Sequence, residues 1–461
     1  MSSKSRSGTL LLALIALCCT LISGPRIALA QQGDGIDRWW AQWNDPMLSG
    51  LIRDAQTHSA NLAQAGLRIE QARAAAVAAG AQARPAVNMN AGAQRGTVQI
   101  GTSLLTASQA SLSLPSSWEL DLFGRVGHGR DAAQARLDSE QAQRGALQVA
   151  LAAETAAAYL QFRFCEAQHG LVQQEAASRA GTARSLEAAV QAGLAAPVQL
   201  AQARSVQADV EQRLIAQATD CEAFLQALGV LSARDLASLR RQLTSGAGQL
   251  PQPRDLDVKT LSAALLVQRP DVAAADRAVA AASADLGAAR ADRYPRLTLN
   301  GNIGPLVLAA RGVSATLLTW SIGPALSLPL LDGGRRAANE EVARVAYAAA
   351  EVRYRETARR AVQEVEEALL RGRAAAERQP ALEATRRSQQ AIHDAVTAKL
   401  SAGLASTLER DETERAMLAA DGAALALHRE RLAAWLQLYR ALGGGWEPTP
   451  SGLATDAARK E

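Results

Sequence analysis

The chain has 461 residues, of which 48% are hydrophobic and 20% are charged, and its formal net charge is +4 at pH 7. Residues 1–30 contain three basic side chains, Lys4, Arg6 and Arg26, and no acidic one, so the rest of the chain carries 46 basic and 45 acidic side chains. This balance excludes the strongly basic surface that is typical of nucleic-acid-binding proteins. We therefore expect no nucleic-acid partner.

The first 30 residues have the pattern of a secretory signal peptide. Basic residues precede an apolar run over 9–22, and the small residues of Ala28-Leu29-Ala30 fit a cleavage site, so the mature chain is expected to begin near Gln31. No later segment has about 18 consecutive apolar residues, which predicts no transmembrane helix. An exported chain of this kind is periplasmic, released, or an outer-membrane barrel.

The four cysteines fall into two groups. Cys18 and Cys19 lie in the apolar run, where lipidation is the alternative to simple cleavage; Leu17 is larger than the residue that usually precedes a lipidated cysteine, which disfavours it. Cys165 and Cys221 remain in the mature chain, and in an oxidising compartment such a pair is more often bridged than free.

Several local features recur with one displacement of 210 residues. The pairs are Pro85 and Pro295, Gly124-Arg125 and Gly334-Arg335, the AGLA segments at 192–195 and 402–405, and Glu154 and Glu364. One common offset predicts an internal duplication. The expected organisation is a signal peptide (1–30), a first structural repeat (31–243), a linker (244–258), a second structural repeat (259–446) and a C-terminal tail (447–461).

Each repeat is expected to contain one helix, two strands and two long helices. The strands are expected near 86–94, 111–122, 296–304 and 320–330. In each of them apolar and polar side chains alternate over roughly 10 residues, the length that a tilted strand needs to cross a bilayer. The apolar sets include Val87, Met89, Leu112, Leu114, Trp118, Leu120, Leu297, Leu299, Ile303, Trp320, Ile322, Leu326 and Leu328. A half-buried sheet of a soluble protein alternates in the same way, so alternation alone leaves both interpretations open.

The long helices are expected at 126–191, 197–229, 334–401 and 406–442. About 66 helical residues at 1.5 Å each would reach on the order of 100 Å, which no ordinary globular domain requires. Alanine fills most positions between sparse large apolar residues, which favours close packing of helices in a bundle or tube. The predicted fold class is mainly α with a small β part: a long α-helical coiled-coil barrel plus four amphipathic strands per chain.

A glycine-rich stretch leads from each strand pair into its long helix. The segment GRVGHG at 124–129 could be a phosphate-binding loop, but its copy keeps only Gly334-Arg335 and loses the later glycines. The strand before Gly124 also has a polar face, with Glu119 and Asp121. We therefore interpret Gly124-Arg125 and Gly334-Arg335 as corners at which a strand passes into a helix.

Four strands cannot close a barrel, and an open strand edge in lipid would leave its N–H and C=O groups without partners. If the strands span a membrane, several chains must contribute to one barrel, so a homo-oligomer in contact with outer-membrane lipid is expected. The AGLA segments supply the reversals between the long helices. Since 193 is the midpoint of 165 and 221, an antiparallel pair folded there puts Cys165 and Cys221 at one height, which a disulfide requires.

Five segments together resemble a known family. They are WWAQWNDPMLSGLI, SWELDLFGR, RPDVAAADRAVAAASADLGAARADRYPRLTLNG, PLLDGGRR and YRALGGGW. The chain is similar to the outer membrane efflux proteins, the TolC-like family, and within it to the NodT-type subunits of multidrug efflux systems. The resemblance implies a trimer with a 12-stranded barrel in the outer membrane of a Gram-negative bacterium and a helical tunnel in the periplasm. It also implies two partners, a periplasmic membrane-fusion adaptor protein and an inner-membrane efflux pump.

The resemblance also implies two kinds of site. The helix turns are where adaptors engage in the family, and the candidates here are Gly193, Leu194, Ala195, Gly403, Leu404 and Ala405. Beyond the second turn the family places acidic residues around the periplasmic aperture, and Glu409 and Glu412 occupy the matching positions, three apart on one helix face. Their counterparts in the first repeat are Gln199 and Gln202. The alternative is a solvated helix surface with ordinary charge patterning.

No catalytic or metal-binding pattern is found. The histidines at 58, 128, 169, 393 and 428 have no metal-ligand spacing with each other or with the cysteines, and no nucleophile motif is present. We therefore expect no enzyme activity, no metal and no cofactor. The predicted function is a passive exit duct for drugs or other small molecules; the alternatives are a type I protein secretion duct and a non-conducting, envelope-spanning coiled coil.

Overall fold

The computed structural model describes residues 39–40, 42–100, 102–251, 268–310 and 313–447. The expected signal peptide with Cys18 and Cys19, the second half of the expected linker and the C-terminal tail after 447 lie outside these ranges.

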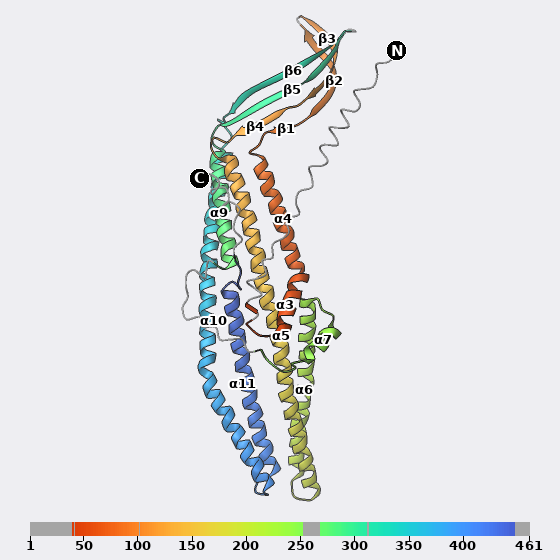
Figure 1. Cartoon of the computed structure of the whole chain (residues 1–461), viewed down its shortest axis with the longest axis vertical. Helices are drawn as coiled ribbons and strands as arrows, with labels where there is room; N and C mark the ends of the chain where they lie inside the picture. Colours follow the sequence, from red (N-terminus) through yellow and green to blue (C-terminus); the bar gives the residue numbers. More distant parts are fainter. Residues whose placement is uncertain (1–38, 41, 101, 252–267, 311–312, 448–461) are drawn as a thin grey trace, which may run out of the picture. The chain divides into compact units, whose positions relative to one another are not determined.

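Helices and strands follow a similar order in the two halves of the chain (Figure 1). The helices are α3 (Pro46–His58), α4 (Ala60–Ala81), α5 (Arg125–Gln191), α6 (Pro197–Ser232), α7 (Leu236–Thr244), α9 (Pro270–Ala291), α10 (Arg335–Ser401) and α11 (Thr407–Ala441). The strands are β1 (Ala86–Val87), β2 (Asn90–Ile100), β3 (Ser103–Ser113), β4 (Ser116–Leu120), β5 (Arg296–Ala310) and β6 (Val313–Ser327). The described chain is mainly helical with one small sheet, as the sequence predicts.

The first strand pair is interrupted on both sides at the same level. Ala86 of β1 pairs with Ser117 of β4, and Asn90 of β2 pairs with Ser113 of β3. The numbers of two paired residues therefore have the same sum in both strand pairs. The constant sum means that β1 and β2 continue one another in a single register, as do β3 and β4. The break in the second of these strands is at Pro115, which has no backbone N–H to donate.

The register also continues between the two repeats. β4 and β3 pair with β5 from Leu120 opposite Leu297 to Ala107 opposite Ala310, and β5 pairs with β6 along its whole length. The sheet therefore consists of four long antiparallel strands in chain order. They cover 86–100, 103–120, 296–310 and 313–327, so each hairpin extends farther from the helices than the alternating pattern predicts.

Cross-strand pairing collects the predicted apolar residues on one face of the sheet. Leu120, Leu297 and Leu326 are neighbours in one row, and paired residues of an antiparallel sheet share a face. Ser117 and Asn300 pair in a row of the opposite face. The apolar face is not covered: Trp320 is 72% exposed and Ile322 is 70% exposed.

Both outer strands of the sheet lack a partner on one side. Within the described residues, β2 pairs only with β3, and β6 pairs only with β5. An unpaired edge exposes a row of backbone N–H and C=O groups.

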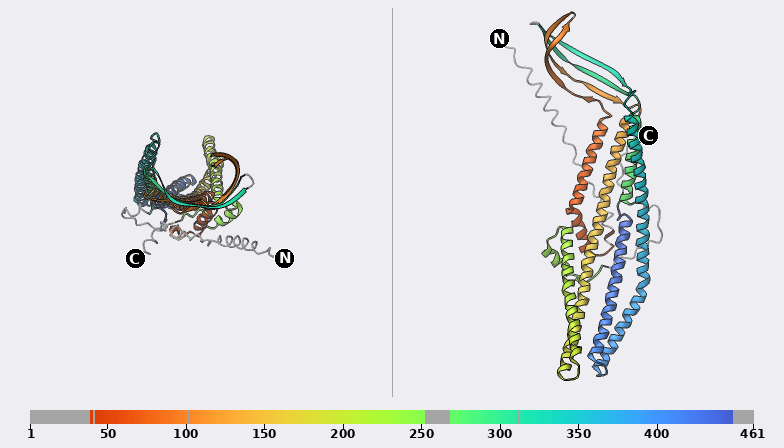
Figure 2. Two further views of the ribbon diagram at one scale, coloured as in Figure 1. Left: turned by 90° about the horizontal axis from the view of Figure 1, so that it is seen from above. Right: turned by 180° about the vertical axis from the view of Figure 1, so that it is seen from behind.

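Four helices continue from the strands as one layer (Figure 2). α5 packs against α4 and α9, and α9 packs against α10. Farther along the chain, α6 packs against α5, and α11 packs against both α10 and α5. Within the described ranges, no helix combines the length and the hydropathy that a membrane span needs.

An aromatic cluster joins the N-terminal segment to α11. Trp40 packs on Tyr439 with ring centroids 4.6 Å apart, and Trp43 meets Trp435 edge to face at 4.6 Å. Such pairs contribute about 0.5–1.5 kcal/mol each beyond the area they bury. The cluster is the centre of the largest hydrophobic core in the described chain.

A polar chain runs beside this core. The Tyr159 hydroxyl donates to Asp45 at 2.7 Å, and Arg163 donates to the Tyr159 oxygen at 3.1 Å and to the Leu243 carbonyl at 2.8 Å. Burial raises the pKa of Tyr159 to about 12. The chain of bonds ties α3, α5 and the end of α7 together.

The crossing of β3 and β5 leaves no room for a side chain at Gly304. A Cβ atom there would lie 1.8 Å from the Leu112 carbonyl oxygen, whereas a Cβ at Gly323 of β6 would meet nothing within 4 Å. We predict that Gly304→Ala lowers the free energy of unfolding by at least about 1–3 kcal/mol, because the backbone must move to make room for the added Cβ atom. Gly323→Ala is the matched control, and equal thermal unfolding midpoints of the two variants would contradict this geometry.

Candidate functional site

The two reversals between long helices have the same backbone geometry. Gly193 and Gly403 are left-handed, with φ of 71° and 73°. Leu194 N–H donates to the Ala189 carbonyl at 2.8 Å, and Leu404 N–H donates to the Lys399 carbonyl at 2.9 Å. These bonds close each helix with a Schellman-type cap, which favours glycine at the left-handed position.

Each turn presents one large apolar side chain to solvent. Leu194 is 84% exposed and Leu404 is 78% exposed, while Ala195 and Ala405 are half-buried beside them. Both turns lie at the helix ends remote from the strands (Figure 1). Val198 and Leu408, four residues farther on, are also exposed, at 61% and 46%, so each helix tip has two exposed apolar side chains.

The helices that follow the turns begin differently. In the second turn the Ser406 hydroxyl accepts a hydrogen bond from the Glu409 N–H at 3.1 Å, which is an N-cap. In the first turn Pro197 opens α6, and the Gln199 side chain accepts from the Ala196 N–H at 3.2 Å. The acidic side chain near the helix start is therefore present only in α11, where it also faces the positive end of the helix dipole.

Glu409 and Glu412 are exposed, and among the described residues their carboxylates have no hydrogen-bond or ion-pair partner. Two neighbouring acidic side chains behave differently. Asp411 is buried and accepts a hydrogen bond from the Thr182 hydroxyl of α5 at 2.6 Å. Glu414 accepts from the Ser178 hydroxyl of α5 at 2.9 Å. In the segment 409–414, Asp411 and Glu414 thus bond α11 to α5, whereas Glu409 and Glu412 are exposed to solvent.

The contact between α5 and α11 also brings two like charges together. Arg179 of α5 lies near Arg415 of α11, and burial together with this like charge lowers the pKa of Arg179. The Arg179 Nε and Arg415 Nη1 atoms are buried and have no hydrogen-bond partner. Two hydroxyl–carboxylate bonds therefore hold α11 against α5 beside two imperfectly satisfied guanidinium groups. We name Ser178, Arg179, Thr182, Asp411, Glu414 and Arg415 the α5–α11 seam.

The first corner is fixed by two carboxylates. Gly124 is left-handed with φ of 78°, and the Asp121 carboxylate accepts from the N–H groups of Val126 at 3.1 Å and Gly127 at 2.6 Å. Arg125 donates to both oxygens of Glu119, at 2.9 and 2.7 Å. The N–H groups of Val126 and Gly127 are thus bonded to Asp121 and that of His128 to the Gly124 carbonyl, and Gly129 lies within α5.

The second corner uses another arginine. Gly334 is left-handed with φ of 86°, and Asp332 accepts from its N–H at 3.1 Å. Arg336, not Arg335, lies 3.6 Å from Asp332 and donates to the Asp292 carbonyl at 2.8 Å. Arg335 is exposed, so the shared Gly-Arg dipeptide does not have one role in both corners.

Cys165 and Cys221 form a disulfide between α5 and α6, with Cα atoms 5.4 Å apart. Their counterparts in the second repeat are Ala375 and Arg431. Few residues of α6 between the turn and Cys221 are buried, and Val210 is the fully buried one. The disulfide therefore holds a helix that makes little core of its own with α5.

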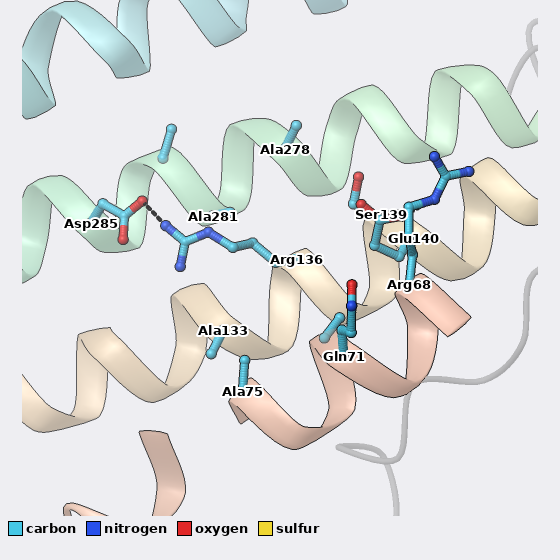
Figure 3. A pocket seen from close by; sticks show the side chains of 12 residues that line it. Arg68, Gln71, Ala75, Ala133, Arg136, Ser139, Glu140, Ala278, Ala281 and Asp285 are labelled. Atoms are coloured by element: carbon cyan, nitrogen blue, oxygen red, sulfur yellow. Dashed lines mark hydrogen bonds and ion pairs between the residues drawn. The ribbon is translucent and has the colours of Figure 1, made fainter. Parts of the chain in front are cut away.

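The described residues contain no group of three or more His, Cys, Asp or Glu that could hold a metal ion. A groove of about 570 Å³ lies between α4, α5 and α9 (Figure 3). Alanines form its floor, and Arg136 bonds to Asp285 across it. It is an alanine-lined surface with paired charges rather than a set of convergent reactive groups.

The family model of the outer membrane efflux proteins matches residues 51–233 and again residues 261–444. The chain belongs to the outer membrane efflux protein family. The two matched segments begin 210 residues apart, the offset found within the sequence.

Relatives match nearly the whole chain. Nodulation protein T of Rhizobium leguminosarum bv. viciae is 30% identical over 89% of this chain and 85% of its own length. Outer membrane protein OprJ of Pseudomonas aeruginosa is 31% identical over 91% and 89%. The solved structure of the outer-membrane channel OprN has a TM-score of 0.76 at 27% identity and covers 89% of this chain and 93% of that one. The chain thus belongs to a family of outer-membrane channels. It is located in the outer membrane, and its helices lie in the periplasm.

The seam yields one prediction about local stability. Thr182→Val removes the hydroxyl that donates to the buried Asp411, and a lost bond of this kind costs about 1–3 kcal/mol. Amide hydrogen exchange in 405–420 should become roughly 5- to 150-fold faster. Thr385→Val, in an exposed threonine that bonds only within α10, should leave this exchange unchanged; equal exchange in both variants would show that the seam does not hold α11.

The disulfide yields a second prediction. Replacing both cysteines by serine should lower the free energy of unfolding by about 4 kcal/mol, because the bridge closes a loop of 56 residues. Cys165→Ser alone breaks the same bridge and should have nearly the same unfolding midpoint as the double variant. Peptide mapping without reducing agent should recover the bridged peptides of the unmodified protein, and free thiols at both positions would contradict the bridge.

Proposed function

We propose that the chain is the outer-membrane channel of a tripartite efflux system, a passive trimeric exit duct for small molecules. The observation that carries the proposal is the combination of a four-stranded sheet with two unpaired edges and one uncovered apolar face. Such a sheet is stable in lipid only if other chains pair with β2 and β6. Three copies in a ring would supply the 12 strands that the family resemblance implies.

The helices support the same assembly. α4 and α10 are the outer members of the helix layer, and each carries exposed apolar residues. On α10 they include Val342, Val345 and Val352 in the part nearest the strands, at spacings of three and seven; on α4 they are Leu67 and Val77, ten apart. These spacings repeat along one helix face, which favours coiled-coil packing of α10 of one copy against α4 of the next.

The periplasmic aperture is proposed at α11. In a trimer, Glu409 and Glu412 would form two stacked rings of three like charges, which attract cations and repel one another. The α5–α11 seam would hold α11 in place, and its release would let the rings separate. We propose that an adaptor protein binds the turns at Leu194 and Leu404 and favours this release, a rearrangement of packed helices.

The cargo is proposed to be small organic molecules selected by the inner-membrane pump. Relatives of similar identity have names that differ in cargo: OpmQ of P. aeruginosa is a pyoverdine export protein at 31% identity, and TtgC of Pseudomonas putida belongs to a toluene efflux pump at 28%. A duct that serves such different molecules at similar sequence distance does not itself need a selective pocket. This supports a passive role.

The gate can be tested by conductance in planar bilayers. Glu409→Gln with Glu412→Gln keeps side-chain size but removes the proposed rings, so leak conductance should rise and the ratio of cation to anion permeability should fall several-fold. Glu366→Gln, in an exposed glutamate of α10, is the control for loss of one charge. Unchanged conductance and selectivity in the double variant would remove these residues from the gate, and a protein that never conducts would contradict the duct itself.

A further inference from the structure

An exposed apolar belt lies where the strands pass into the long helices. It consists of Leu122 and Phe123 before α5, Tyr294 after α9, and Leu330 and Leu331 before α10, and we name these five residues the corner belt. Leu331 is 97% exposed, Leu330 83% and Leu122 64%. No described element covers them, although a soluble corner would normally carry polar residues at such positions.

The belt continues the apolar face of the sheet. On β6 this face includes Leu318, Trp320, Ile322 and Leu326, and the same alternation leads on to Leu328 and Leu330 after the strand ends. From Leu318 to Ser327 the strand advances by about 30 Å, or roughly 23 Å along the membrane normal at a tilt of about 40°. An outer-membrane barrel has an apolar band about 25 Å tall. The strand alone therefore fills the band, which leaves the corner belt at the level of the lipid headgroups.

Aromatic packing at the corner fits this level. The rings of Phe123 and Tyr294 are stacked with centroids 4.8 Å apart, and both remain about half exposed, at 44% and 52%. Tyrosine is enriched at membrane–water interfaces, where its amphipathic ring sits at the level of the lipid headgroups. A stacked pair joins the two repeats here without hiding either ring from the surroundings.

Two described arginines at the strand–helix corners have no ion-pair partner, Arg84 before β1 and Arg335, and Arg335 is the one that follows the belt residues Leu330 and Leu331 along the chain. Most of the corner arginines are paired: Arg125 with Glu119, Arg293 and Arg290 with Glu340, Arg296 with Asp292, and Arg336 with Asp332. Arg335, four residues after Leu331, is exposed, and within the described ranges its guanidinium makes no hydrogen bond or ion pair. A guanidinium binds phosphate oxygens in a bidentate manner.

We propose that the corner belt is embedded in the periplasmic leaflet of the outer membrane and that Arg335 binds the phosphate of a lipid headgroup there. The belt supplies a hydrophobic anchor just below the sheet, and the arginine fixes the depth at which the sheet sits. The inference goes beyond the duct and does not require conduction. It rests on the proposed placement of the sheet in an outer-membrane barrel.

Depth can be measured with an environment-sensitive fluorophore. The double variant Cys165→Ser/Cys221→Ser receives a single cysteine by Leu331→Cys, is labelled, and is reconstituted in phosphatidylglycerol/phosphatidylethanolamine vesicles. Lipids that carry a nitroxide close to the headgroup should quench this probe strongly. Leu194→Cys in the same background is the control, since Leu194 is similarly exposed but lies at a helix turn. An unquenched probe at 331, whether its emission indicates water or a neighbouring protein subunit, would overturn the proposal.

The headgroup contact can be measured separately by native mass spectrometry. Phosphatidylglycerol is added to the detergent-solubilised protein, and the molecules retained per assembly are counted. Arg335→Gln should lower the count by one per chain, whereas Arg359→Gln, in an exposed arginine farther along α10, should not. Equal retention by both variants would refute the role of Arg335. The planar-bilayer conductance of the same samples is measured in parallel. Samples that conduct but show equal lipid retention contradict the role of Arg335 alone, whereas samples that do not conduct contradict the duct.

Discussion

The unpaired edges of the sheet are the constraint on which the rest of this structure depends. One continuous register carries the pairing from β1 and β2 through β3, β4 and β5 to β6, so the two repeats are already joined within one chain. The same register leaves the two outer edges of the sheet, on β2 and β6, without partners. Because backbone groups in lipid must be paired, membrane insertion and self-assembly become one requirement. The exposed apolar faces of α4 and α10 repeat this requirement in the periplasmic part.

The two repeats share a framework but differ where function is proposed. Their turns are closed by equivalent glycines, and both corners use a left-handed glycine with a nearby aspartate as cap. The disulfide belongs only to the first repeat. The acidic residues at 409–414 of α11 belong only to the second, since the counterparts of Asp411 and Glu414 are Ala201 and Arg204. The α5–α6 hairpin is thus fixed covalently, whereas near the second turn α11 is bonded to α5 by two side-chain hydrogen bonds that can be exchanged for water.

The features that sequence could predict are local ones. A turn needs a left-handed glycine within a few residues, so the AGLA segments located Gly193 and Gly403, and a period of two revealed the faces of the strands near the helices. The alternation predicts strand ends at 94 and 320, whereas the strands extend to Ile100 and begin at Val313, because polar residues there interrupt the alternation while the register continues.

The seam and the role of Arg335 could not be predicted in this way. Asp411 and Glu412 are adjacent and both acidic, and only the packing of α11 on α5, through a contact 229 residues away in sequence, buries one and exposes the other. Similarly, Gly-Arg occurs at both corners, but Glu119 is within reach of Arg125 and no acid is placed to pair with Arg335 in the described chain. Long-range pairing of side chains is set by tertiary packing, which spacing along the chain does not encode.

The mass of the intact assembly, measured by native mass spectrometry after gentle extraction from the membrane, tests the central claim most directly. If copies of the chain close the open edges of β2 and β6, the particle should contain three chains and no stable monomer should be found. A folded single chain that remains monomeric in detergent, with its outer strands intact, would contradict the account.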